Sequence, residues 1–363
     1  MGYGFYRALT IDKTKVPNTN RTDFPVLVSG TYSWLATVAN GGKVQHASGY
    51  DVAFYSDAAL TTQLKHEIER WIATTGEVVY HVKVPTVSTS VDTVIYIAYG
   101  DAGISTDQSD AVNVWDTNYK GVWHFPNGTT LTALDSTAND NDGTISGATA
   151  TTGQVGGGAN FDGNDTIAKT SATLDMASAV TVEAWFKLTS LSSGSFSRLV
   201  EHGPLGSGPW TEYALNLWND AGVYQWYFEL SPGGTNQTLG KTGISTGTWY
   251  HAVGVYDGSN KYIYHNGSQA ATSAASGAFP AHNDITTFGY RDGPSQYFNG
   301  VLDEVRISSV ARSADWIATE YNNQNSPSTF YAVGAEVVTG RPRISALTFG
   351  TPIHSLVNAG LVG

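Results

Sequence analysis

Apolar and polar residues alternate in short runs along the first 120 residues. Such alternation places successive side chains on opposite faces of an extended strand. The runs recur about every 10 to 15 residues and are separated by turn-forming residues, the spacing of an antiparallel β-sandwich. We therefore predict a β-sandwich domain over residues 1–121. Its strands are expected in YRALTID, FPVLVSG, YDVAFYSD, LKHEIERWI, GEVVYHVKVP and DTVIYIAYG.

The run LKHEIERWI places Glu67 and Glu69 on one strand face, opposite His66 and Arg70. Two carboxylates two residues apart are candidates for an acid/base pair. The pattern favours the alternative, a strand face that is solvated or paired with arginine.

From Val122 the chain becomes rich in Asp, Asn, Gly and Thr, and a second series of strands follows. The clearest is VTVEAWFKLTSL, in which apolar residues alternate from Val180 to Phe186. We predict a second β domain over residues 122–336. Residues 337–363 show no domain pattern, so we predict a docking tail. The alternative is a final strand added to one of the sheets.

The stretch Tyr297–Tyr321 predicts a strand, a short link and a helix. Ser313 is a suitable N-cap, and Asp315 falls in the first turn, where negative charge is favoured. Asp303 and Glu304 are adjacent in the strand, so we expect them to point to opposite faces.

Charge and composition exclude several classes of protein. The net charge is -12, from 19 Lys+Arg and 31 Asp+Glu, which argues against a nucleic-acid partner. Cysteine is absent, so disulfides, cysteine-bound zinc and a thiol nucleophile are excluded. No stretch is long and apolar enough to span a membrane, and the N-terminus does not read as a signal peptide. These features suit a cytoplasmic protein or a virion component made in the cytoplasm.

Two groups of sequence phrases carry family resemblances. YRALTID, YDVAFYSD, HEIERW, IYIAYG and VWDTNYKGVWHF resemble an uncharacterised β-rich domain family that precedes lectin-like domains in bacterial, archaeal and phage surface proteins. GGGANFDGNDTI, VTVEAWFK, GTWYHAVGVYDG, YIYHNG and FNGVLDEVRI resemble the laminin-G-like, concanavalin A-like lectin domain. The resemblances imply an all-β chain of two β-sandwich domains, the second a concanavalin A-like jelly roll.

Carboxylate and amide oxygens near glycines suggest calcium. Asp162 and Asp165 lie in the turn FDGNDTI, and the resemblance places this turn beside the strand that carries Asp303. We therefore predict that Asp162 or Asp165 meets Asp303 at one calcium ion. The alternative is that these carboxylates cap turns by accepting backbone N–H groups.

Sugar binding in this fold uses aromatic faces together with amides and charged groups. The aromatic-rich hairpin from Trp210 to Phe228 and the later loop GYRDGPSQYF supply the candidates. They are Trp210, Trp218, Tyr224, Trp226, Tyr290, Arg291 and Asp292. Of these, Trp210, Arg291 and Asp292 have the best loop positions.

We predict a non-enzymatic virion structural protein, a capsid decoration, fibre or tail component. It would be a homo-oligomer that contacts other virion proteins and displays the lectin-like domain towards host-surface glycans. The first alternative is a secreted bacterial adhesion or carbohydrate-binding protein, extracellular or on the cell surface. The second is a polysaccharide-degrading glycosidase that depends on Glu67 or Asp303, although the Glu-x-Asp-x-Glu strand of sugar-cleaving relatives is absent. A structural cement that binds no glycan is the third.

Overall fold

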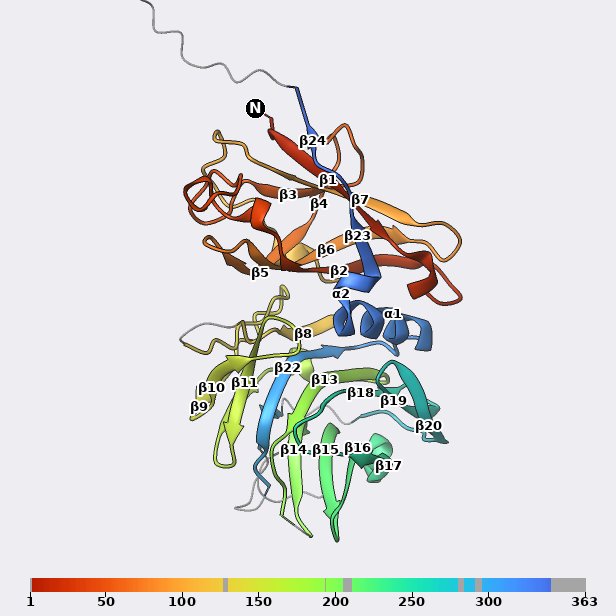
Figure 1. The fold of residues 1–363 in the computed structure, drawn as a ribbon. Helices are drawn as coiled ribbons and strands as arrows, with labels where there is room; N and C mark the ends of the chain where they lie inside the picture. Colours follow the sequence, from red (N-terminus) through yellow and green to blue (C-terminus); the bar gives the residue numbers. More distant parts are fainter. Residues whose placement is uncertain are drawn as a thin grey trace, which may run out of the picture.

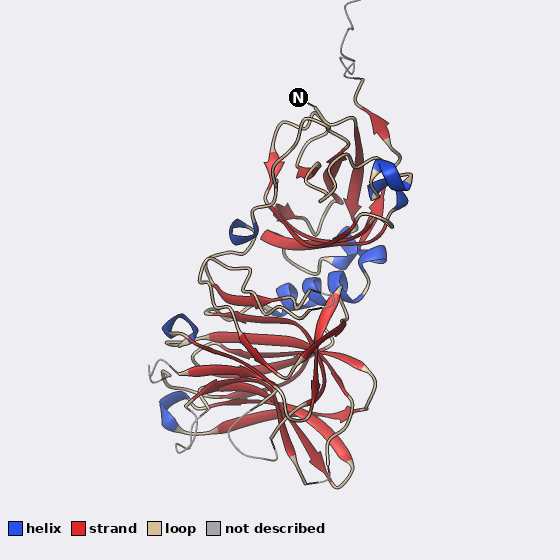
Figure 2. Ribbon diagram, turned by 90° about the vertical axis from the view of Figure 1, so that its left-hand side faces the viewer, coloured by secondary structure: helices blue, strands red, loops and turns tan. Residues whose placement is uncertain are grey.

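The computed structural model describes residues 2–126, 130–192, 194–204, 211–279, 284–290 and 296–340. Figure 1 shows two β domains stacked end to end, with two helices between them. The all-β prediction is confirmed, and strands dominate both domains in Figure 2 as well. Within the described ranges, no helix has the length and apolar character needed to cross a membrane.

The N-terminal domain is a sandwich of a large and a small sheet. The large sheet runs β23 (Tyr331–Val333), β1 (Phe5–Ile11), β7 (Thr93–Tyr99), β3 (Val52–Tyr55) and β4 (Gln63–Leu64), with β24 (Val337–Val338) also paired to β1. The small sheet runs β2 (Arg21–Thr31), β6 (Glu77–Val87) and β5 (His66–Ile72). Alternate apolar residues from both sheets, such as Leu9 and Phe54 against Val26 and Tyr80, form one core.

The second domain is a larger sandwich, and we call its two sheets the near sheet and the far sheet by their distance from the N-terminal domain. The near sheet runs β10 (Thr149–Thr152), β11 (Gly157–Asp162), β22 (Asn299–Ser308), β13 (Val180–Leu188), β18 (Trp249–Tyr256), β19 (Asn260–His265) and β20 (Ser268–Ala274), with β8 (Tyr119–Trp123) paired to β22. The far sheet runs β17 (Gln237–Ile244), β16 (Val223–Leu230), β15 (Tyr213–Asp220), β14 (Phe196–Gly203), β21 (Ile285–Phe288), β12 (Thr166–Thr170) and β9 (Thr144–Ser146). The inner faces of both sheets meet in one core, where Phe186 and Leu302 join Leu215 and Phe228.

The domain boundaries differ from those that the sequence predicts. Strand β8 already belongs to the second domain, since Tyr119 pairs with Ser308. The chain then returns to the N-terminal domain, where Val333 pairs with Leu9 and Val338 with Phe5. The strand alternative is therefore correct for residues 337–338, and the second domain does not extend to residue 336. Residues 341–363 of the predicted tail lie outside the described residues.

Helix α1 (Ala314–Asn325) lies between the two domains, followed by α2 (Pro327–Phe330) (Figure 1). The predicted N-cap is confirmed, because Ser313 Oγ accepts a hydrogen bond from Trp316 N at 3.2 Å. The Trp316 ring meets Phe24 of the N-terminal domain at 4.9 Å between centroids, while Ile317 packs on the near sheet. The helix thus joins the two domains through opposite sides of its apolar surface.

A β-bulge in β22 changes the direction of two acidic side chains. The pairing with β13 shifts between Asp303 and Arg306, and Glu304 has a positive φ of 49°. Leu302 and Val305 both enter the core, so Asp303 and Glu304 between them both point away from it. The expectation that these two carboxylates face opposite ways is wrong, because a bulge sets two residues against one and breaks the period-two rule.

Candidate functional site

The outer face of the far sheet carries a hollow of about 530 Å³. Strand alternation creates it, since Leu215 and Leu217 enter the core while Asn216 and Trp218 point outward. This face is turned away from the N-terminal domain (Figure 1). The lining residues come from four strands, the residue before β17 and one later segment. They are Phe196, Arg198, Trp218, Gln225, Tyr227, Glu229, Asn236, Thr238, Gly240 and Gln296.

Three aromatic side chains form one wall of the hollow. The rings of Phe196 and Trp218 lie 4.0 Å apart between centroids, and Tyr227 meets Phe196 edge-on at 6.3 Å. Phe196 is 40% exposed, so part of its ring faces solvent. Exposed aromatic faces of this kind suit the apolar face of a sugar ring.

A buried ionic network forms the floor. Arg198 Nη1 donates to Glu229 Oε2 at 2.7 Å and lies 3.4 Å from Glu201 Oε2. Asn216 and Asn236 each donate to Glu229 at 2.8 Å, so both of its carboxylate oxygens are held. Burial opposes the charge of Arg198, but Glu201 and Glu229 raise its pKa. The floor is therefore fixed in orientation before any ligand arrives.

Among the predicted sugar-binding residues, the structure places Trp218 in this hollow. Trp226 is fully buried in the core, and Tyr224 is a partly buried residue packed against that core. Tyr290 stacks on Tyr297 with 4.4 Å between ring centroids. Trp210, Arg291 and Asp292 lie outside the described residues.

Sequence reasoning missed Phe196, Arg198, Tyr227 and Glu229. Tyr227 and Glu229 alternate with the core residues Trp226 and Phe228, so the period-two pattern already contained a signal for them. The sequence contained no signal that β14, which carries Phe196 and Arg198, lies beside β15 and near β16. The order of strands in a sheet depends on long-range pairing.

The predicted calcium residues do not meet at one point. Asp162 pairs with Asn299 and Ala159 with Leu302, so Asp303 sits about 13 Å along the strand from Asp162 at 3.3 Å per residue. Asp165 Oδ2 accepts the Asp162 N–H and Asp303 Oδ2 accepts the Val155 N–H, both at 2.8 Å. This is the turn-capping arrangement that the sequence left as the alternative, and the binding of calcium by this chain stays a prediction.

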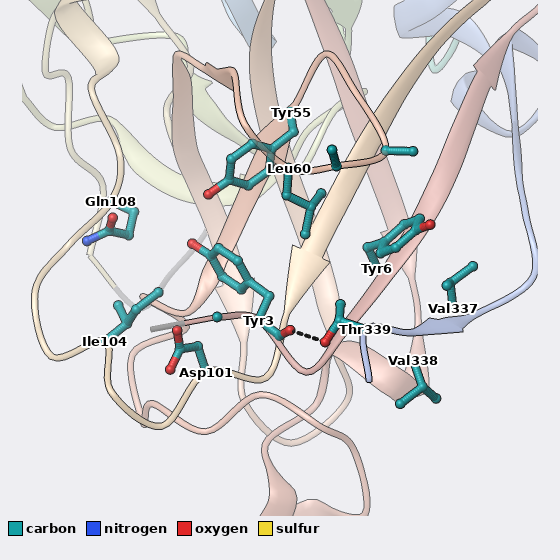
Figure 3. A pocket seen from close by; sticks show the side chains of 13 residues that line it. Tyr3, Tyr6, Tyr55, Leu60, Asp101, Ile104, Gln108, Val337, Val338 and Thr339 are labelled. Carbon is teal, nitrogen blue, oxygen red and sulfur yellow. Dashed lines mark hydrogen bonds between the residues drawn. The ribbon is translucent and has the colours of Figure 1, made fainter. Parts of the chain in front are cut away.

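A second hollow of about 530 Å³ lies in the N-terminal domain, and Figure 3 shows the side chains that line it. Tyr3, Tyr6 and Tyr55 line it together with Asp101 and residues of β24. Tyr3 meets Tyr55 edge-on at 5.8 Å, and burial, followed by Tyr55, raises the pKa of Tyr3. The Tyr3 phenol is therefore a neutral hydrogen-bonding group.

A cluster of ionisable side chains is buried between the two domains. Glu67 and Glu69 share one face of β5 as predicted, but the expected solvated or arginine-paired face is wrong, because both contact His124. Burial opposes the charge of His124, but Glu304 and Glu67 raise its pKa well above the usual value. Burial also acts against ionised Glu67, yet His124 lowers its pKa to about 2. Burial raises the pKa of Glu69.

The fold assigns this chain to a structural class, the all-β proteins with two sandwich domains. The second of these domains has a lectin-like form. Residues 161–318 match the concanavalin A-like lectin/glucanases superfamily, Laminin_G_3, and residues 48–138 match a domain of unknown function, DUF2341. The chain therefore contains a DUF2341 domain followed by a concanavalin A-like domain, which confirms the predicted arrangement.

Several solved structures are similar to this chain. Domain 4 of AbnA, an extracellular arabinanase from Geobacillus stearothermophilus solved with arabinotriose, has a TM-score of 0.44 and 20% identity over 56% of this chain and 98% of its own. The binding domain of Paraclostridial Mosquitocidal Protein 1 has a TM-score of 0.45 and 13% identity over 56% of this chain and 52% of its own. The botulinum neurotoxin serotype D binding domain has a TM-score of 0.45 and 14% identity over 59% of this chain and 53% of its own. The chain thus spans about half of each toxin structure. No curated protein matches the chain.

Proposed function

We propose that this chain binds carbohydrate through the hollow on the far sheet, without cleaving it. The observation that carries the proposal is the pairing of an exposed aromatic wall with an oriented ionic floor. Phe196 and Trp218 offer faces for a sugar ring, while Arg198 and Glu229 offer a donor and an acceptor for hydroxyl groups. Both groups lie within one open surface, as an extended glycan requires.

A second candidate function is that of a glycosidase, because two carboxylates lie on the outer face of the far sheet. Glu201 and Glu229 both lie opposite Ala214, on the two strands that flank β15, and both contact Arg198. A glycosidase keeps the space between its carboxylates for the scissile bond and, in inverting enzymes, a water molecule. Here Arg198 occupies that space, which supports binding. The predicted glycosidase alternative depends on Glu67 or Asp303, and both side chains are buried.

A glycan array with the labelled full chain tests the proposal. We expect binding to a limited set of glycans and its loss in Trp218→Ala. The matched control is Trp249→Ala, on the near sheet, where Trp249 lies against Lys187. Binding that is absent, or that survives Trp218→Ala, would count against the hollow. Release of reducing ends from a bound glycan, lost in Glu201→Gln, would establish the glycosidase instead.

The proposed setting is a virion surface, where the chain would be a decoration, fibre or tail component and form homo-oligomers. A cysteine-free chain suits folding and assembly in a reducing cytoplasm. The two-domain layout supports the idea, because the hollow faces away from the N-terminal domain and would remain open if that domain were anchored. Mass spectrometry of purified particles tests it, and particles that lack the chain would favour a secreted adhesion protein.

A further inference from the structure

Four side chains from both domains converge at the buried interface. Glu69 comes from β5 and His81 from β6, while His124 follows β8 and Glu304 comes from β22. Each offers one ligand atom, and these atoms all lie within 4.8 Å of one another. His81 Nε2 is 3.0 Å from Glu69 Oε2 and 3.9 Å from Glu304 Oε1. His124 Nδ1 is 3.8 Å from Glu69 Oε2 and 2.5 Å from Glu304 Oε1.

The cluster is closed to solvent and its polar atoms are incompletely satisfied. The side chains of Glu69, His81, His124 and Glu304 are at most 3% exposed. Among the described residues, Glu69 Oε1 has no hydrogen-bond partner, although buried carboxylate oxygens normally have one. The Glu69 carboxylate is fully buried, with Oε2 beside two imidazoles and Oε1 unsatisfied, and this points to a ligand that the protein atoms do not supply.

The balance of charge also points to a cation. Glu67, Glu69, Asp303 and Glu304 are all buried within the same region. In the part of the chain that the structure describes, the positive or titratable nitrogen groups that face these carboxylates are the imidazoles of His81 and His124 and the guanidinium of Arg306. Arg306 is shared between Glu304, Glu320 and Glu183. Buried carboxylates in such excess are costly unless they are neutralised or coordinate a metal ion.

The side chains around His124 match the outer shell of a metal site. His124 Nδ1 faces Glu69 and Glu304, whereas its Nε2 lies 3.4 Å from Glu67 Oε2. Glu67 is itself held by Trp115 Nε1, which donates to Oε2 at 2.9 Å, and by the Ser136 hydroxyl. Metal-binding histidines commonly donate a hydrogen bond from the second ring nitrogen to a carboxylate. Glu67 is the carboxylate next to His124 Nε2, at a separation that is longer than a hydrogen bond in this structure.

The backbone is also adapted at this point. Bulges interrupt β5 between Ile68 and Arg70 and β22 around Glu304, so each acidic member of the cluster stands at an irregularity. Glu304 adopts a φ of 49°, a conformation that is uncommon for a non-glycine residue. Strained residues and bulges that redirect a side chain concentrate at sites.

We propose that Glu69, His81, His124 and Glu304 form a zinc site that joins the two domains. Two imidazole nitrogens with two carboxylate oxygens suit zinc, whereas calcium and magnesium prefer oxygen ligands throughout. Four ligands at about 2.0 Å in a tetrahedron lie about 3.3 Å apart. The 3.8 and 3.9 Å separations in the cluster would have to shorten and the 2.5 Å separation between His124 and Glu304 would have to widen. Because Glu69 and His81 belong to one domain and Glu304 to the other, zinc would hold the domain interface closed.

Zinc added to metal-stripped, untagged full chain tests the site. We expect each chain to hold one zinc ion tightly through this cluster, measured by elemental analysis after gel filtration. The Tm of the zinc-loaded chain should exceed that of the metal-stripped chain by about 5 °C or more. Glu69→Gln and His81→Gln should each bind one equivalent fewer and lose the rise in Tm. The matched control His251→Gln, a buried histidine 3.8 Å from Glu183, should keep both. Retention of the full zinc content by both cluster variants would overturn the proposal.

A measurement on the unaltered chain covers the case in which the variants do not fold. Cobalt(II) replaces zinc in such sites, and nitrogen ligation in a four-coordinate site gives visible absorption bands stronger than those of aqueous cobalt. We expect these bands to saturate and to be abolished by added zinc. A spectrum that remains that of aqueous cobalt would overturn the site. Neither the zinc measurements nor the cobalt spectrum depends on glycan binding, so their outcome is independent of the proposed function.

Discussion

The carboxamide of Asn323 pairs with the backbone of Leu27, 296 residues away. Its Nδ2 donates to Leu27 O at 2.9 Å, and its Oδ1 accepts from Leu27 N at 2.7 Å. Leu27 lies in β2, which is an edge strand of the small sheet, so the amide takes the place of a neighbouring strand. Helix α1 is thereby attached to the N-terminal domain by the same two bonds that a β-ladder would make.

Asn323→Ala should lower the free energy of unfolding by about 2 to 4 kcal/mol, because it leaves the buried N–H and C=O of Leu27 without partners. Urea unfolding followed by tryptophan fluorescence measures this. Asn325→Ala is the matched control, since Asn325 is exposed at the end of the same helix. Equal stability of the two variants would show that the amide does not anchor the helix.

Removal of residues 326–363 should destabilise the N-terminal domain. The shortened chain loses β23 and β24, and β1 then presents an unpaired edge that favours aggregation. Hydrogen exchange of the β1 amides and light scattering measure the effect. A chain that ends at Gly340 retains both strands and is the control. Equal protection of β1 in the two shortened chains would contradict the assignment of β23 and β24 to this domain.

Glu229→Gln should weaken glycan binding at least about tenfold, which corresponds to about 1.4 kcal/mol. The change keeps the shape of the side chain but removes the charge that orients Arg198. Calorimetry with a glycan identified on the array measures the affinity. Gln237→Glu, on the adjacent strand and outside the residues that line the hollow, is a control for altered surface charge. An unchanged glycan affinity in Glu229→Gln would show that the ionic floor does not contribute to binding.

His66 should make stability sensitive to mild acid. Burial lowers its pKa from 6.5 to about 4. The Leu64 backbone, Asp107 and Asp110 oppose this shift, and Lys65 adds to it. The unfolded chain therefore binds a proton between these two values that the folded chain does not. Stability is retained above pH 6.5 and falls as the pH drops towards 4, by up to about 3 kcal/mol, before the effect levels off.

Urea unfolding at a series of pH values measures this contribution. His66→Leu should reduce the loss between pH 6.5 and pH 4, whereas His46→Gln, at a half-buried position, should leave it unchanged. Parallel stability profiles for the wild type and His66→Leu would assign the acid sensitivity to other groups.

The sequence alone determined the β-sandwich class, the order of the two domains and the cap of helix α1. These features depend on local alternation and on residues three positions apart, such as Ser313 and Trp316. Local patterns also placed Glu67 and Glu69 on one face. They did not predict that this face is buried, because burial depends on what another domain brings against it.

Only the tertiary structure decided which distant residues meet. The bulge at Glu304 breaks the period-two rule and directs two carboxylates to the domain interface, where His81 and His124 lie. Pairing of β23 and β24 with β1 completes the large sheet of the N-terminal domain with strands that follow the second domain in the sequence. Sheet order, likewise, brings Phe196 beside Trp218. Strand register, bulges and domain contact are set by long-range packing, and a single-strand pattern carries no information about them.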